Sequence, residues 1–245
     1  GQVLPYYFQS LEEARESGQY DKAQTILEKI GKYQLKYGKE VHPGASKINA
    51  EVLYNKLAPF NHLFLAYLLA GSLMLLFAIV SFFHQSRGIR FILKSLRISI
   101  VLCLLLHSGG LAFRAYISGH AHWSDAYETM IYIGWATMLI GLFLSRTSYL
   151  ALGATAFVVS ILLMVAHWNW LDPAIANLQP VLNSYWLMIH VAIIVASYGP
   201  FTLGMVLGLI CLFLMVFINA RNQERMKAQI RKLTLTSELA LTLGL

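Results

Sequence analysis

One histidine, His190, lies near the start of a long apolar stretch that includes residues 178–201. Pro180 ends the preceding segment, and Asn183 or Ser184 could cap the first turn of the helix that the stretch predicts. At about 1.5 Å of rise per residue, the imidazole would lie roughly 10 Å below the helix start, which is shallow for a membrane. Such a group could be an iron ligand or a hydrogen-bonded core histidine, and composition favours neither.

Aromatic residues gather around this histidine in the sequence. Trp186 precedes His190 by four residues, so the two share one helix face, and the Tyr185-Trp186 pair suits a membrane–water boundary. Trp123 and Tyr127 fall in or beside a polar loop earlier in the chain. Flat rings beside an imidazole could cover a planar macrocycle, whereas aromatic residues at such boundaries are usually membrane anchors.

A second polar set lies on one helix face at spacings of three and four residues: His107, Gly110 and Arg114. Arg114 could extend its guanidinium to the membrane surface or clamp a carboxylate. His107 is deeper, and ligand and packing roles remain equally open for it. Asp125 and Glu128 are spaced as the N-cap and capping-box partner of the next helix.

Composition excludes an ordinary soluble domain. Of the 245 residues, 57% are apolar and 13% charged, and the mean hydropathy of +0.57 indicates a polytopic membrane protein. The net charge of +7 is spread over short clusters between apolar runs, so it reports topology and gives no nucleic-acid signature. Cys103 and Cys211 lie inside apolar runs and form neither a disulfide framework nor a CxxC site.

The apolar runs predict an all-α fold with five complete spans and the start of a sixth. The first two spans lie at 60–83 and 98–118. The third follows the loop 119–125 and ends at 144, and the fourth lies at 149–166. The fifth contains His190, and the sixth begins after Ser237. Alternating the sides places every basic loop on one side, which is cytoplasmic by the positive-inside rule. We therefore expect His190 and the loop 119–125 on the outer side.

The polar segment 1–59 predicts an extracytoplasmic helical arm, and 60–245 forms a second, transmembrane domain. Helical spacing predicts a hairpin broken by Gly18 and ended near Gly38, with a capping box at Ser10–Glu13. The chain opens with Gly1 and stops within an apolar run, so we expect it to be a truncated piece of a longer protein.

Three segments resemble a known family: ISGHAHWSDAYETMIYIGW (117–135), LQPVLNSYWLMIHVAIIVASYG (178–199) and the terminal TSELALTLGL. They are similar to the cytochrome c assembly protein of the System II cytochrome c synthase, the CcsA or fused CcsBA type. The resemblance runs from Asn55 onward, over about three quarters of the chain. The family is a polytopic protein of the bacterial inner membrane, with its haem-presenting site on the periplasmic side.

The resemblance implies a holocytochrome c synthase (haem lyase) activity, in which haem b is held on the outer face for thioether attachment to the CxxCH segment of apocytochrome c. His190 matches the first of two external histidines that ligate the iron, and no residue is assigned a catalytic role. Around it we expect Trp186, Trp123 and Tyr127 to line the cavity and Arg114 to lie near a propionate.

The resemblance also implies components beyond these residues. The WGxxWxWD signature and the second external histidine are expected after Leu245, so this chain would hold only part of the site; the HWNWLDP segment at 167–173 lacks the signature's spacing. A ResB-like partner or fused portion is expected, and His107 matches no family ligand by position and stays a secondary cofactor-binding candidate. The alternative is a transporter or permease subunit for haem or another amphiphile, without catalytic attachment.

Overall fold

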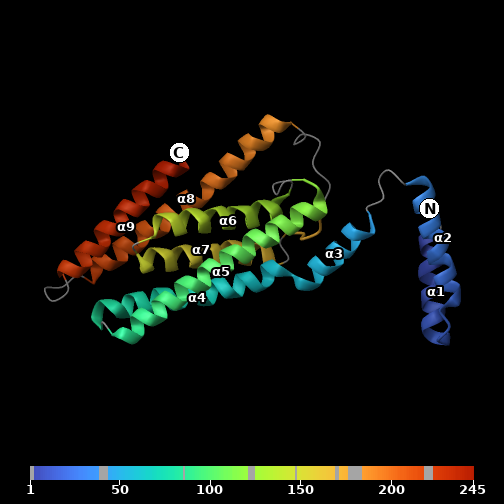
Figure 1. Cartoon of the computed structure of the whole chain (residues 1–245), viewed down its shortest axis with the longest axis horizontal. Coiled ribbons are helices and arrows are strands. Elements are labelled where there is room, and N and C mark those ends of the chain that lie inside the picture. The colour runs from blue at the N-terminus through green and yellow to red at the C-terminus, as the bar shows by residue number, and fades with distance from the viewer. Residues whose placement is uncertain are drawn as a thin grey trace. The chain divides into compact units, whose positions relative to one another are not determined.

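The computed structural model describes residues 3–38, 44–84, 86–120, 125–146, 148–168, 171–175, 184–217 and 223–245. These residues form helices and no strand, as the sequence predicts. The helices are α1 (Val3–Ser17), α2 (Asp21–Tyr37), α3 (Ala45–Leu57), α4 (Pro59–Phe83), α5 (Arg87–Ser118), α6 (Ala126–Leu144), α7 (Tyr149–His167), α8 (Tyr185–Val216) and α9 (Gln223–Gly244) (Figure 1).

The chain divides into two compact units, Gly1–Ala50 and Glu51–Leu245. In the first unit, α1 and α2 pack as the predicted hairpin through the buried Ala14 and Ala23. Gly18 makes the turn with a φ of 73°, a conformation that glycine adopts without steric cost. Lys22 donates to Glu13 at 2.8 Å across the two helices.

The predicted capping box at Ser10 is wrong. Ser10 lies in the middle of α1, where its side chain is buried and its hydroxyl donates to the carbonyl of Tyr7 at 2.7 Å. The helix begins at Val3 because the apolar and aromatic residues before Ser10 continue the helical pattern, and Pro5 fits within a first helical turn.

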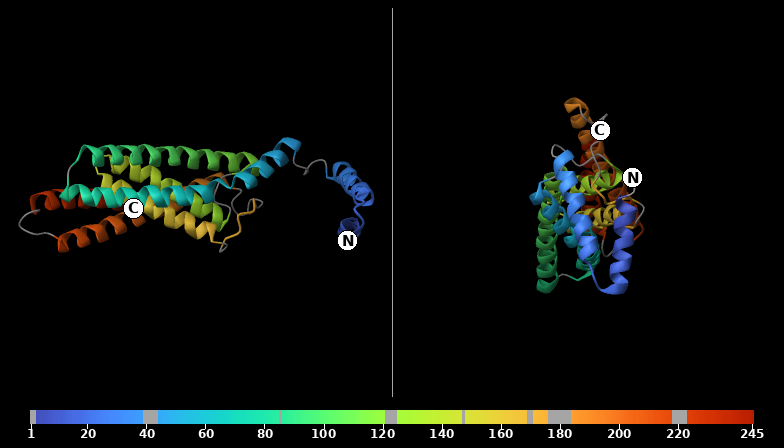
Figure 2. Two further views of the ribbon diagram at one scale, coloured as in Figure 1. Left: turned by 90° about the horizontal axis from the view of Figure 1, so that it is seen from below. Right: turned by 90° about the vertical axis from the view of Figure 1, so that its right-hand side faces the viewer.

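In the second unit, α4 to α9 form a helical bundle. α4 packs on α5 and α7, α7 on α6, α6 on α8, and α8 on α9; α4 to α7 run side by side in the views of Figures 1 and 2. Small residues allow the closest of these contacts. A Cβ added to Gly71 of α4 would lie 2.7 Å from the backbone nitrogen of Phe157 in α7, so only glycine permits this approach.

Four helices in the described part of the chain are long and apolar enough to cross a membrane: the run Ala45–Phe82, and α6, α7 and α8. The surface agrees, because the side chains of Leu65, Leu69, Leu73 and Leu76 form an exposed apolar stripe along α4 that suits contact with lipid. The chain is therefore a polytopic membrane protein. The segment 98–118, predicted as a further span, lies in α5 and is not one of the four.

The first turns of α8, which carry His190, are not buried in the bundle. Ser184 is the N-cap residue of α8, as one of the two predicted, but its side chain makes no capping hydrogen bond. The buried residues of α8 begin only at Val195, so its first turns hold only exposed and half-buried residues. Further along, Ser237 of α9 donates to the carbonyl of Gly204 at 2.9 Å and fixes α9 on α8.

Candidate functional site

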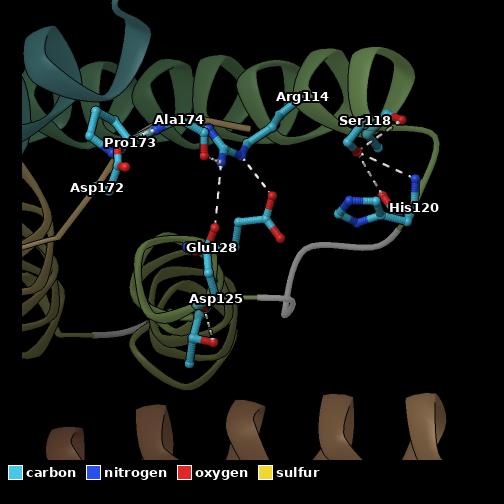
Figure 3. A network of polar contacts seen from close by, with 10 residues as sticks. Arg114, Ser118, His120, Asp125, Glu128, Asp172, Pro173 and Ala174 are labelled. Carbon is cyan, nitrogen blue, oxygen red and sulfur yellow. Dashed lines mark hydrogen bonds and ion pairs between the residues drawn. The ribbon is translucent and has the colours of Figure 1, made fainter. Parts of the chain in front are cut away.

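Arg114, on the last turns of α5, is the centre of a polar network at one end of the bundle (Figure 3). Its Nε donates to Oε1 of Glu128, on α6, at 2.9 Å. Its Nη1 donates to the carbonyl of Pro173 at 2.9 Å and its Nη2 to the carbonyl of Ala174 at 3.1 Å. Asp125 completes the Arg114 network, with its Oδ2 4.0 Å from Nη2. The guanidinium thus joins α5, α6 and the segment 171–175 that follows α7.

Burial makes these contacts energetically important. The side chains of Arg114 and Glu128 are 0% and 1% exposed, so each charge has lost its water and depends on the other. The ring of Tyr127 lies 5.0 Å from the guanidinium carbon and covers one face of it. Arg114 therefore does not extend to the membrane surface, which was one of the two roles expected for it.

Asp125 positions the start of α6. Its Oδ1 accepts a hydrogen bond from the backbone N–H of Glu128 at 2.7 Å, which confirms the predicted N-cap. Burial raises the pKa of the Asp125 carboxyl, although the N–H of Glu128 and the Arg114 guanidinium oppose this rise. Oε1 of Glu128 accepts from Arg114, so this carboxylate also joins α6 to α5, and its capping-box role stays a prediction.

The other acceptors of Arg114 come from a segment with its own local order. Asp172 Oδ1 accepts from the backbone N–H of Ala174 at 2.9 Å, which turns the chain at Pro173. Nε, Nη1 and Nη2 each donate one hydrogen bond to a protein oxygen, so a carboxylate ligand could reach only the second N–H group of Nη1 or Nη2 without displacing one of them. The carboxylate-clamp role of Arg114 remains a prediction.

His107 lies deeper in the same face of α5. Gly110 and Arg114 are buried with it, which confirms that the three share an inward face. The Nε2 of His107 is 3.1 Å from the carbonyl of Ile131, whereas its Nδ1 is buried without a partner among the described residues. The ring lies edge-on to Phe60, with centroids 5.4 Å apart. These contacts explain a packing role, and a ligand role would use Nδ1.

His190 and Trp186 lie together on the exposed first turns of α8, four residues apart. Trp186 is 78% exposed and makes an edge contact with Tyr185, at a centroid distance of 5.8 Å. In the described part of the chain no hydrogen bond or ion pair holds His190, so its imidazole is accessible to a ligand. Trp123, the remaining predicted aromatic residue, lies outside the described residues.

A cavity of about 460 Å³ opens beside the Arg114 network, and we name it the Asn55 cavity. Its walls come from the end of α3, the starts of α4 and α6, the end of α7, and the segment 171–174. Tyr127 is shared between the network and the cavity. The lining residues are Tyr54, Asn55, Ala58, Pro59, Asn61, Tyr127, Ala166, His167, Leu171, Asp172, Pro173 and Ala174.

The fold and the site define a polytopic helical membrane protein with a buried arginine network and an accessible histidine on α8. The family model described as "Cytochrome C assembly protein" matches residues 123–245. The chain belongs to the cytochrome c assembly protein family.

Individual relatives agree with the family model. The chain is 41% identical to Protein NrfI of Wolinella succinogenes over 227 residues, which are 93% of this chain and 25% of that protein. It is 33% identical over 120 residues to the cytochrome c biogenesis protein CcsA of Prochlorococcus marinus (47% of this chain, 38% of that protein). It is 30% identical over 174 residues to CcsA of Pyropia yezoensis (68% and 51%). The match thus spans a quarter to about half of these relatives.

Sequence reasoning missed the residues that complete the network. Pro173 and Ala174 contribute backbone carbonyls, 59 and 60 residues from Arg114, and a carbonyl leaves no mark in the sequence. Asn55 and Asn61 were also missed, because the sequence around them indicates only the polar segment before the first span and its beginning. The Asp172-Pro173 pair was the one available signal, since it marks a turn.

Proposed function

We propose that this chain is the haem-handling part of a cytochrome c synthase, which presents haem b for thioether attachment to the CxxCH segment of apocytochrome c. Membership in the cytochrome c assembly family carries the general role. The exposed imidazole of His190 beside Trp186 supports the position of the haem site, because the iron needs an accessible neutral nitrogen and the haem ring needs a flat apolar neighbour.

Attachment needs no oxidant and no leaving group. Each cysteine thiol adds across one vinyl group of the haem: the sulfur bonds one vinyl carbon and a proton ends on the other. The reacting atoms belong to haem and client, so the protein contributes orientation and protection. In this proposal His190 is an axial ligand to reduced iron until the client histidine replaces it.

Further residues have defined roles in the proposal. Trp186, Trp123 and Tyr127 cover the edge of the haem, Arg114 acts near a propionate, and His107 is a secondary cofactor-binding candidate. The second axial ligand and a ResB-like partner or fused portion complete the site. None of these side chains is assigned a covalent step.

The proposal requires His190 and the Arg114 network to face the periplasm across the bacterial inner membrane. We propose five complete spans, with 98–118 of α5 as the second and an extracytoplasmic arm at 1–59. The exposed side chains of Leu102, Leu105 and Leu106 on α5 support this, because they form an apolar surface suited to lipid. The basic side chains of 87–97 and 221–232 then share the cytoplasmic side.

Substitution of His190 in the whole protein tests the ligand assignment. We expect His190→Ala to reduce the haem that copurifies with the protein, and His190→Cys to shift its absorption spectrum, because a thiolate replaces an imidazole on the iron. Trp186→Phe is the matched control, since it keeps an aromatic ring next to the histidine. Haem spectra that are unchanged in both His190 variants would refute the assignment.

A further inference from the structure

An apolar groove of about 380 Å³ lies between the second halves of α4 and α8, and we name it the α4–α8 groove. Leu75 and Ile79 belong to α4, Leu150 belongs to the start of α7, and the remaining lining residues lie on α8 between Val206 and Leu214. Every lining side chain is aliphatic or aromatic, so the groove offers a ligand no hydrogen-bonding side chain. A molecule that fits it must be apolar along this part of its length.

The groove opens onto the outer surface of the bundle. Leu209 and Phe213 on its α8 wall are 58% and 57% exposed, whereas Leu150 is 3% exposed and forms the floor. The outer surface of a membrane-spanning helical bundle is surrounded by lipid tails. An acyl chain is therefore the apolar molecule that reaches this groove most directly.

A cation lies just beyond the end of the groove. Arg225, in the first turn of α9, donates from Nη1 to the carbonyl of Phe82 at 3.5 Å. Phe82 follows the groove residue Ile79 by three positions on α4, so the guanidinium lies about one helical turn beyond the groove, at the end of the bundle where α4 ends and α9 begins (Figure 2). Arg225 is exposed, and no ion pair within the described part of the chain neutralises it. Its other N–H groups are available to an anion.

The surroundings of Arg225 are strongly basic. The segments 84–97 and 223–232 contain eight lysine and arginine residues in the sequence, and Glu224 is their one acidic residue. A headgroup with a net negative charge is attracted to such a surface, whereas a zwitterionic headgroup gains little. The charge thus selects among the lipids whose tails could occupy the groove.

We propose that the α4–α8 groove binds an acyl chain of an anionic phospholipid, whose phosphodiester headgroup pairs with Arg225. The apolar lining and the cation beyond it match a molecule that carries an apolar tail and a negative head. An apolar helix in the groove would cover the lining but would leave the guanidinium without an anion. The groove lies on the second half of α8, away from His190 on its first turns, so this lipid site goes beyond the proposed haem chemistry and does not require it.

Photolabelling of the whole protein in lipid vesicles tests the site. The probe is phosphatidylglycerol with a diazirine in one acyl chain, and phosphatidylcholine with the same chain is the matched control probe. After irradiation in phosphatidylcholine vesicles, peptide mass spectrometry locates the adducts. We expect the phosphatidylglycerol probe to label 206–214 and the α4 wall at least fivefold more than the control probe does. Equal labelling by the two probes, or no lipid adduct in the groove, would overturn the proposal.

Substitution of the cation tests the headgroup contact. We expect Arg225→Gln to lower groove labelling by the phosphatidylglycerol probe about fivefold and to leave labelling by the control probe unchanged. Arg146→Gln is the matched control, because it removes the same charge from a guanidinium that lies 4.5 Å over the ring of Phe143 on α6, a helix that contributes no residue to the groove. Equal losses in the two variants would show a general surface charge effect and would overturn the assignment of Arg225.

Filling the groove tests the position of the acyl chain. Leu209→Trp places a large ring in the groove, and we expect labelling of Leu75 and Ile79 by the phosphatidylglycerol probe to fall at least fivefold. Leu212→Trp is the control on the same helix, since Leu212 is 62% exposed and does not line the groove. A loss in Leu209→Trp no larger than in Leu212→Trp would place the lipid elsewhere and refute the proposal.

Discussion

Replacing Arg114 with leucine leaves the Glu128 carboxylate buried without its cation. Both side chains are at most 1% exposed and lie 2.9 Å apart, so Glu128 cannot recover water when the guanidinium is removed. Breaking a buried pair from one side costs about 3–5 kcal/mol, and we expect Arg114→Leu to lower the free energy of unfolding by about that amount. The carbonyls of Pro173 and Ala174 add little, because those residues are exposed and water can replace the guanidinium.

A double-mutant cycle isolates this interaction. Arg114→Leu with Glu128→Leu removes both charges, so we expect the double variant to be more stable than either single variant. Unfolding in mixed detergent micelles, followed by circular dichroism, measures the four free energies. Arg97→Leu is the control on the same helix, since Arg97 donates to an exposed carbonyl of Arg146 at 3.1 Å; we expect a change within about 0.5 kcal/mol. Additive losses in the double variant would refute the coupling.

Two further predictions concern packing and pH. Gly199→Ala places a Cβ 3.0 Å from the Thr137 Cα and should cost about 1–3 kcal/mol of unfolding free energy in the same micelle assay. Gly208→Ala is the control on the same helix: its Cβ meets nothing within 4 Å, and the substitution should cost no unfolding free energy. Equal losses in the two variants would contradict the packing of α8 on α6. Lys22 lowers the pKa of Glu13 from 4.5, so their contact should stabilise the hairpin above that pH and be lost as the pH falls through the lowered value. Carboxyl NMR titration of Glu13 checks this, and an ordinary pKa there would contradict it.

Local patterns predicted the parts of the structure that depend on neighbours along the chain. The spacing of His107, Gly110 and Arg114 predicted one buried face, and the spacing of Asp125 and Glu128 predicted the cap of α6. Both succeed because helical periodicity is fixed by backbone geometry. The same reasoning failed at Ser10, where a cap signal fell inside a helix that apolar residues had already begun.

The partners of Arg114 could not be predicted, because they depend on how distant segments pack. Pro173 and Ala174 interact through backbone atoms, which every residue has, and only the folded chain brings them to the guanidinium. The extent of α9 was missed for a different reason. The helix begins at Gln223, well before the apolar run after Ser237, since its basic first half is helical without being apolar.

Covalent haem on a coexpressed CxxCH client measures the central claim most directly. The client is denatured after expression with the whole protein, and its bound haem is quantified by haem staining. Because substitution of residues that merely support a metal ligand already costs about 10- to 100-fold, we expect His190→Ala to lower the yield at least tenfold and added imidazole to restore part of it. A yield equal to that of the unsubstituted protein, with or without imidazole, would contradict the account.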